Sequence, residues 1–173
     1  MQFDPSIVQT RYACPLGMMT LAATRSGLAG VWFDDQRHLP AALVVHASWP
    51  LDTHHPVLTR TAQQLGEYFA GQRQVFDVPL DLSGGTAFQQ AVWQALLAIE
   101  PGQTSSYGNV SKTIGNAAAV RAVGAAVGRN PISIIVPCHR VLGADGSLTG
   151  YAGGLDRKTA LLRLEGVLDK NLL

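Results

Sequence analysis

The sequence predicts an α/β protein in two parts: a small antiparallel sheet plus a helix over residues 1–83, and a helix-turn-helix domain over residues 84–173. Two observations predict this division. The first part has short apolar runs on either side of a glycine-containing turn, whereas the second has successive segments with apolar residues at helical spacing. Between them, Ser83-Gly84-Gly85 is the most flexible stretch in mid-chain, and we place the domain boundary there.

The first part is expected to hold a strand pair, one helix and a further strand. Residues 19–24 and 30–33 flank the glycine-containing turn and predict an antiparallel pair. From Pro56 to Phe69 apolar residues recur at helical spacing, and Gly71 follows as a stop. Residues 76–82 alternate roughly as a strand does.

The second part is expected to begin with three helices. Residues 86–89 have the form of a capping box, and the helix that they open ends before Pro101-Gly102. A short helix over about 107–114 ends at a glycine, and Asn116 is suited to cap a third helix over 117–127. Two short helices joined by a glycine-containing turn are typical of a helix-turn-helix.

The predicted recognition helix, 117–127, carries almost no side chain that could hydrogen-bond a base edge. A reader of the major groove needs several such groups, and this helix has only Arg121. A smooth helix with one long cation is better suited to the minor groove, with the arginine inserted where a nucleotide is displaced. The alternative is that the helix merely packs closely against another helix, with Arg121 in solvent.

A cysteine lies at the end of the most apolar β-branched run. Residues 132–136 predict a buried strand, and Pro137-Cys138-His139-Arg140 follow at its end. A lone cysteine in this setting can be a small core residue. A reactive thiol needs a base or cation nearby, which His139 and Arg140 could supply.

A carboxylate near the C-terminus is a candidate partner for that histidine. Residues 157–166 predict a helix on which Leu161, Leu164 and Glu165 are neighbours, so Glu165 lies on or beside the apolar stripe. A buried carboxylate needs a partner, and an imidazole is a natural one. Glu165 could instead be a solvated residue of the last turn. If it does pair with His139, then Cys138, His139 and Glu165 form a relay in which the base is itself oriented.

Composition limits the remaining possibilities. The chain has 173 residues, of which 47% are hydrophobic and 14% charged, as in an ordinary globular protein. No apolar run reaches the roughly 18 residues of a membrane span, so we expect a cytoplasmic protein with no membrane partner. The net charge of +1 divides into −2 over residues 1–86 and +3 over residues 87–173. Cys14 and Cys138 show no spacing for a disulfide framework or a zinc site, so no metal is expected.

Together these residues carry a resemblance to a known family. The run from Gly85 to Leu168 resembles the C-terminal domain of the O6-alkylguanine-DNA alkyltransferases, also called methylated-DNA–protein-cysteine methyltransferases. The matching segments share the order and spacing of that domain: residues 86–89, 106–108, 120–124, 130–131, 136–141, 150–154, 157–158 and 164–166. The first 83 residues match only loosely. The resemblance implies a ribonuclease H-like N-terminal domain and a winged-helix-like C-terminal domain.

The resemblance also implies a reaction. The alkyl group of O6-alkylguanine in DNA, and by extension of O4-alkylthymine, would pass irreversibly to Cys138 in direct-reversal repair. The protein would act once, without a cofactor, as a monomer on double-stranded DNA. Binding would be through the minor groove, independent of sequence, with the damaged nucleotide flipped out of the stack.

The implied roles fall on particular residues. Cys138 would be the acceptor, His139 the base acting through a water, and Glu165 the group that orients His139. Asn130 would hold the turn before the cysteine, and Tyr107 would help protonate the departing guanine. DNA contacts are implied for Arg121, Tyr107, Gly108, Asn116 and Ala122. The guanine pocket is implied to be lined by Val141, Tyr151 and Ala152.

Three other functions compete with this one. A non-catalytic binder of alkylated DNA would lack the acceptor thiol, and a transcription regulator would need base-reading side chains on residues 117–127. A Cys-His hydrolase is the third, since Cys138, His139 and Glu165 superficially resemble a triad. Such hydrolases usually place the cysteine at a helix N-terminus with the histidine far away in sequence, whereas here the two are adjacent.

Overall fold

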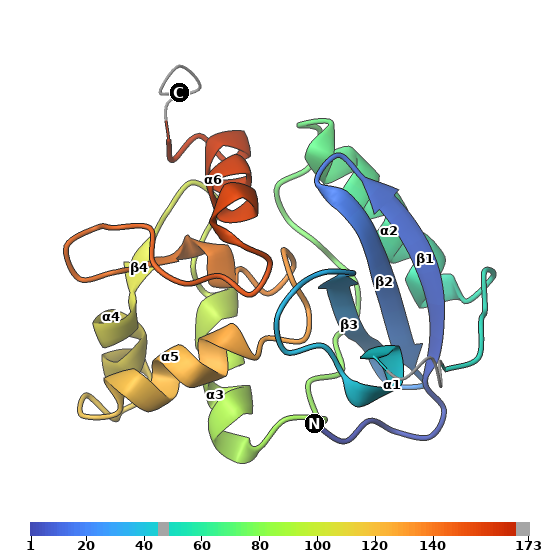
Figure 1. The fold of residues 1–173 in the computed structure, drawn as a ribbon, viewed down its shortest axis with the longest axis horizontal. Helices are drawn as coiled ribbons and strands as arrows, with labels where there is room; N and C mark the ends of the chain where they lie inside the picture. The colour runs from blue at the N-terminus through green and yellow to red at the C-terminus, as the bar shows by residue number, and fades with distance from the viewer. Residues whose placement is uncertain (45–48, 169–173) are drawn as a thin grey trace. The chain divides into compact units, whose positions relative to one another are not determined.

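A computed structural model describes residues 1–44 and 49–168 (Figure 1). The chain divides into two compact units, Met1–Thr86 and Ala87–Leu173. The domain limits 1–83 and 84–173 stay a prediction. Among the helices of the described residues, none has both the length and the apolar character needed to cross a membrane.

The first unit is built on a three-stranded antiparallel sheet in the order β1-β2-β3 (Figure 1). Its strands are β1 (Val8–Cys14), β2 (Gly17–Thr24) and β3 (Gly27–Phe33), followed by the short α1 (Ala41–Val44). The predicted pair is confirmed as β2 and β3, whereas β1 was not predicted. The predicted helix is confirmed as α2 (Pro56–Phe69), which packs against all three strands.

Every residue of β3 is buried, because the sheet is covered on both faces. Beside the contact with α2, a cluster of apolar residues gathers around Trp32: Ile7, Ala22 and Ala29, with Phe3, Leu39, Leu43 and Trp49 packed against it. The indole of Trp32 lies over Gly30, where a Cβ atom would meet the ring at 1.7 Å. Only glycine fits at this position.

The expected strand over residues 76–82 is wrong. Only one isolated bridge forms, Leu28 with Leu80, through Leu28 N–H to Pro79 O (2.8 Å) and Asp81 N–H to Leu28 O (2.7 Å). Pro79 has no N–H to continue a ladder, so the segment stays extended without becoming a strand.

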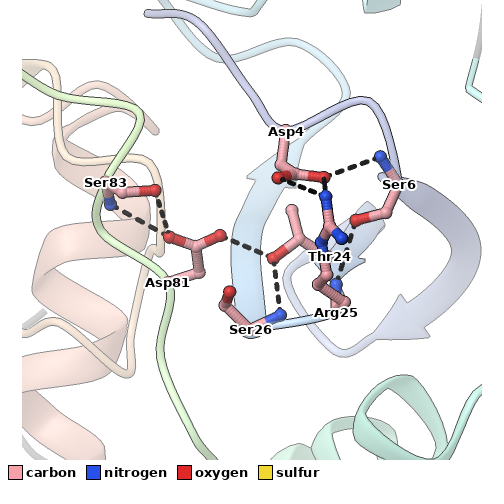
Figure 2. A network of polar contacts seen from close by, with 7 residues as sticks. All are labelled: Asp4, Ser6, Thr24, Arg25, Ser26, Asp81 and Ser83. Atoms are coloured by element: carbon pink, nitrogen blue, oxygen red, sulfur yellow. Dashed lines mark hydrogen bonds and ion pairs between the residues drawn. The ribbon is translucent and has the colours of Figure 1, made fainter.

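Side chains instead fix the end of this segment (Figure 2). Thr24 Oγ donates to the Asp81 carboxylate at 2.5 Å, and Ser83 N–H and Oγ donate to its other oxygen. At the same turn, Arg25 pairs with Asp4 at 3.3 Å. The network therefore ties the chain leading to the boundary and the N-terminal segment to the β2–β3 turn.

The second unit begins with three helices that pack on one another: α3 (Ala87–Leu97), α4 (Tyr107–Thr113) and α5 (Val120–Gly128). The fully buried Trp93 joins α3 to α5 by donating its indole N–H to Ala126 O at 2.9 Å. Ser106 caps α4 by accepting from Asn109 N–H at 3.1 Å. The helix-turn-helix expected from sequence is α4, the turn after it, and α5.

The predicted start of the third helix is wrong. Asn116 does not cap it, because its backbone carbonyl accepts from Ala119 N–H at 3.0 Å and from the Ser111 hydroxyl. These bonds fold the chain after Asn116 into a turn, and α5 begins only at Val120. Arg121 therefore lies in the first turn of α5 and not near its middle.

The rest of the unit surrounds one short turn of 3-10 helix, η1 (Cys138–Arg140). The strand β4 (Ser105–Ser106) pairs in parallel with β5 (Val141–Leu142), and α6 (Leu155–Leu164) packs against η1. The start of α4 and the chain after η1 are thus held side by side.

Candidate functional site

The segment that leads to Cys138 is a series of buried turns and not the strand predicted over residues 132–136. Val136 N–H bonds Ile132 O at 3.0 Å, and Ile135 N–H bonds Ser133 O at 2.9 Å. Ile134 has a φ of +73°, a left-handed conformation that a β-branched residue rarely adopts. Such a conformation costs on the order of 1–3 kcal/mol and persists only where the surroundings determine it, often at a functional site.

The side chain of Asn130 supplies those surroundings. Its amide nitrogen donates to Val136 O at 2.7 Å and its oxygen accepts from Ile132 N–H at 3.0 Å. Asn130 is 4% exposed, so these bonds replace the partners that a strand neighbour would have offered. The same amide nitrogen lies 3.1 Å from Cys138 Sγ, to which it donates.

Cys138 is a buried thiol, 5% exposed, at the start of η1. Burial raises the pKa of Cys138, while the Asn130 hydrogen bond and the positive charge of Lys158 oppose that rise. The site therefore holds the thiol protonated until a base removes the proton, and it then offers a hydrogen bond and a charge to the thiolate.

The predicted base, His139, follows Cys138 directly along the chain. His139 is fully buried, and its Nε2 lies 2.8 Å from Glu165 Oε1. Burial lowers the pKa of His139 against the opposing hydrogen bond and charge of Glu165, so the imidazole is neutral at neutral pH. Because the carboxylate can only accept, Nε2 carries the proton and Nδ1 keeps a lone pair. That Nδ1 has no hydrogen-bond partner among the described residues.

Glu165 is buried and ionised, as the relay interpretation requires. It caps the end of α6, and its side chain is 2% exposed. Burial alone would raise the pKa of Glu165, but the hydrogen bonds and charges of His139 and Arg140 lower it to about 2. The alternative of a solvated last-turn residue is therefore excluded.

Arg140 does not supply the cation near the thiol that the sequence suggested. Its guanidinium binds both oxygens of Glu165, with Nε to Oε2 at 2.8 Å and Nη2 to Oε1 at 2.9 Å, and it also donates to Ile99 O. Sequence reasoning missed this pairing, because the adjacent positions of His139 and Arg140 in the sequence gave no signal that both side chains bind Glu165. The cation that acts on the thiol is Lys158, which sequence reasoning did not single out.

The predicted proton donor, Tyr107, and the predicted pocket residues come from three segments of the second unit. Tyr107 starts α4, and its hydroxyl donates to Thr149 O at 3.2 Å. Burial raises the pKa of Tyr107, so its hydroxyl stays protonated at neutral pH. Val141 is buried directly after η1, and the half-buried Tyr151 and Ala152 follow the loop that Thr149 ends.

The predicted DNA-contacting residues all belong to the helix-turn-helix, and most of them are exposed. Arg121 and Ala122 are exposed in the first turn of α5, Asn116 is exposed in the turn before it, and Gly108 is half-buried in α4. The residues of α5 that face the core are Val123, Ala126 and Val127. The helix thus packs by one side, and its exposed residues are Val120, Arg121, Ala122 and Ala125.

Family models match nearly all of the chain outside its ends. Residues 7–82 match the model described as 6-O-methylguanine DNA methyltransferase, ribonuclease-like domain. Residues 87–167 match the model described as 6-O-methylguanine DNA methyltransferase, DNA binding domain.

Individual relatives agree with these models. The methylated-DNA–protein-cysteine methyltransferase of Mycobacterium tuberculosis is 50% identical over 151 residues, which cover 87% of each chain. The protein of that name from Methanosarcina acetivorans is 47% identical over 155 residues, covering 90% of this chain and 96% of the relative. The crystal structure of Mycobacterium tuberculosis OGT in complex with DNA is similar with a TM-score of 0.84 and 47% identity, covering 92% of this chain and 93% of that one.

Proposed function

This chain belongs to the 6-O-methylguanine DNA methyltransferase family, and from that premise we propose that Cys138 is its acceptor thiol. The protein is a methylated-DNA–protein-cysteine methyltransferase: it binds DNA and repairs it directly by moving a methyl group to a cysteine. The single observation that carries the assignment to Cys138 is its environment. The thiol accepts a hydrogen bond from Asn130 and adjoins a histidine whose Nε2 binds a buried carboxylate.

We propose the following transfer on O6-methylguanine in DNA. His139 Nδ1, acting through a water, takes the proton of Cys138, and Glu165 stabilises the imidazolium that forms. The thiolate attacks the methyl carbon, so an S–C bond forms while the bond from carbon to guanine O6 breaks. The electron pair stays on the guanine, which takes a proton from the Tyr107 hydroxyl. The product is a thioether that no neighbouring group can hydrolyse, so each molecule acts once.

Recognition of the damaged base is proposed to depend on nucleotide flipping from the minor groove. The exposed side of α5 offers small residues for close approach to the backbone and one long cation, Arg121, in its first turn. Val141, Tyr151 and Ala152 would line the pocket for the flipped guanine, and Gly108, Asn116 and Ala122 would contact the DNA. A monomer suffices, because all of these residues belong to one unit of one chain. We place the protein in the cytoplasm, where a reducing environment keeps the acceptor thiol free.

The test is the stoichiometry of transfer. With an excess of duplex DNA containing O6-methylguanine, the intact mass of the protein should rise by one methyl group per chain and then stop, and peptide mapping should place the group on Cys138. Catalytic turnover of an ester or peptide, or a methyl group mapped to Cys14, would contradict the assignment.

Replacement of Arg121 by alanine should weaken repair of duplex DNA by about tenfold and leave the reaction with the free modified base near normal. The free base needs no displaced neighbour, so only the duplex reaction depends on the inserted side chain. The measurement is the second-order rate constant of methyl transfer on each substrate.

The matched control is Arg129→Ala, which removes the exposed cation that follows the other end of α5. It should cause a smaller and salt-dependent loss on the duplex. Equal losses on both substrates for Arg121→Ala would mean that Arg121 does not displace a nucleotide.

A further inference from the structure

A buried lysine close to the acceptor is not used by the mechanism above. Lys158 lies on α6 and is 0% exposed. Its ammonium donates to three backbone carbonyls, those of Val141 (2.6 Å), Thr149 (2.9 Å) and Gly150 (3.2 Å). No carboxylate of the described residues pairs with it. Lysine is almost never fully buried without a pairing charge, so its presence here indicates a role beyond packing.

The three carbonyls belong to the two segments that flank the proposed pocket. Val141 directly follows η1, the turn that carries Cys138. Thr149 and Gly150 end the loop that begins at Gly143 and leads into the pocket residue Tyr151. One ammonium group therefore ties the cysteine segment to the pocket loop.

A second group converges on the same point. The Tyr107 hydroxyl also donates to Thr149 O, at 3.2 Å, so this carbonyl accepts from both the lysine and the proposed proton donor. A shift of the loop end would move the partner of Tyr107 together with the pocket wall. Through Thr149 O, Lys158 therefore bears on both the proposed proton donor, Tyr107, and the pocket loop.

The charge of Lys158 acts on the thiol as well. The titratable and charged groups that bear on Cys138 are Tyr107, on α4, and Lys158, on α6, with His139 beside it on η1. Tyr107 is neutral at neutral pH, and Arg140 is bound to Glu165. Burial lowers the pKa of Lys158 to about 8, and the negative charge of the thiolate opposes that fall. The lysine is therefore mostly protonated at pH 7 and favours the thiolate.

We propose that Lys158 is a positioning residue for methyl transfer, which holds the pocket loop against the cysteine segment and supplies the buried positive charge that favours the thiolate. This inference rests on the proposed role of Cys138. Helix α6 and its C-cap would then contribute two groups to the site: Glu165, which orients His139, and Lys158, which favours the thiolate of Cys138. The competing explanation is that Lys158 only stabilises the fold.

The test is Lys158→Met, which keeps much of the side-chain volume and removes the charge and its three hydrogen bonds. The midpoint of the pH profile for iodoacetamide alkylation of Cys138 should rise by about one unit, and methyl transfer at pH 7 should fall about tenfold on both the free base and the duplex. Arg157→Met is the matched control, since it removes the neighbouring cation, which donates to Gly153 O. It should leave the alkylation midpoint where it is in the wild type.

Lys158→Arg separates the charge from the hydrogen-bond geometry. It should keep the wild-type alkylation midpoint but slow methyl transfer several-fold, because a planar guanidinium cannot direct its donors to the same three carbonyls. An unchanged midpoint in Lys158→Met, even with reduced stability, would overturn the inference. If that variant does not fold, a raised midpoint in Lys158→Arg would overturn it instead, since the charge is retained there.

The two proposals fail in different ways. If the wild-type chain gains no methyl group on Cys138, the proposed acceptor is wrong. The alkylation profile needs no DNA and no methyl transfer, so it still reports whether Lys158 favours the thiolate.

Discussion

Replacing Cys138 by serine should abolish methyl transfer while DNA binding is retained. A serine hydroxyl is far less acidic than a thiol and its oxygen is a weaker nucleophile toward a methyl carbon, so the rate should fall on the order of 10³-fold or more. The oxygen can still accept the hydrogen bond that Asn130 donates to Cys138 Sγ, so the turn before it should persist. The exposed face of α5 is not altered. The measurements are intact mass after incubation with O6-methylguanine duplex, and affinity for the same duplex.

The control for this variant is Cys14→Ser, the other cysteine of the chain, which lies on β1 in the first unit. It should gain one methyl group as the wild type does. A methyl gain in Cys138→Ser would show that another residue accepts the group. Loss of DNA binding in Cys138→Ser would show that the substitution disturbs the fold as well as the chemistry.

Periodicity predicted the elements whose cause is local. The helix α2 begins at Pro56 and ends at Phe69 as expected, because a proline at its start and a glycine after its end mark both boundaries. The start of the short helix at about residue 107 was likewise expected, and in the structure Ser106 caps α4 there. These signals act over a few residues and are visible in one sequence.

Elements fixed by distant partners were not predicted. Residues 132–136 have strand composition, but none of the strands among residues 1–44 and 49–168 pairs with them along a ladder, and the Asn130 side chain bonds their backbone in buried turns. Asn130, Cys138, His139 and Glu165 were nevertheless singled out, because their spacing resembles that of a known family, and the structure brings their side chains together in one buried cluster. The roles of Arg140 and Lys158 were missed, since both depend on which carbonyl or carboxylate the fold brings beside a buried cation.

Replacing Glu165 by glutamine should damage both the chemistry and the fold. The carboxylate holds His139 through Nε2 and neutralises Arg140 by two hydrogen bonds. Without its charge, His139 becomes a weaker base and the pKa of Cys138 should rise. Methyl transfer at neutral pH should fall about 100-fold, the contribution of a positioned base. Removing one partner of a buried ion pair should also lower the free energy of unfolding by about 3 to 5 kcal/mol.

The stability difference between the wild type and Glu165→Gln should depend on pH in a definite direction. The pKa of Glu165 is about 2 in the folded chain, against an ordinary value of 4.5. A lowered carboxylate pKa means that the folded state binds fewer protons, so the stabilisation is fully present above about pH 4.5 and is lost as the pH falls through 2. Denaturant unfolding of both proteins between pH 7 and pH 2 should therefore give a difference that shrinks with acid, because glutamine does not titrate.

The matched control is Glu67→Gln, which removes the carboxylate of a partly exposed ion pair with Arg73 at 2.6 Å in the first unit. Solvent screens that pair, so the variant should change stability little and leave the alkylation profile of Cys138 at its wild-type position. A Glu165→Gln protein with an unchanged alkylation profile would remove Glu165 from the relay, even if its stability fell. A pH-independent stability difference would instead mean that Glu165 is not held ionised by His139 and Arg140, and the relay would lack the carboxylate charge that stabilises the imidazolium of His139.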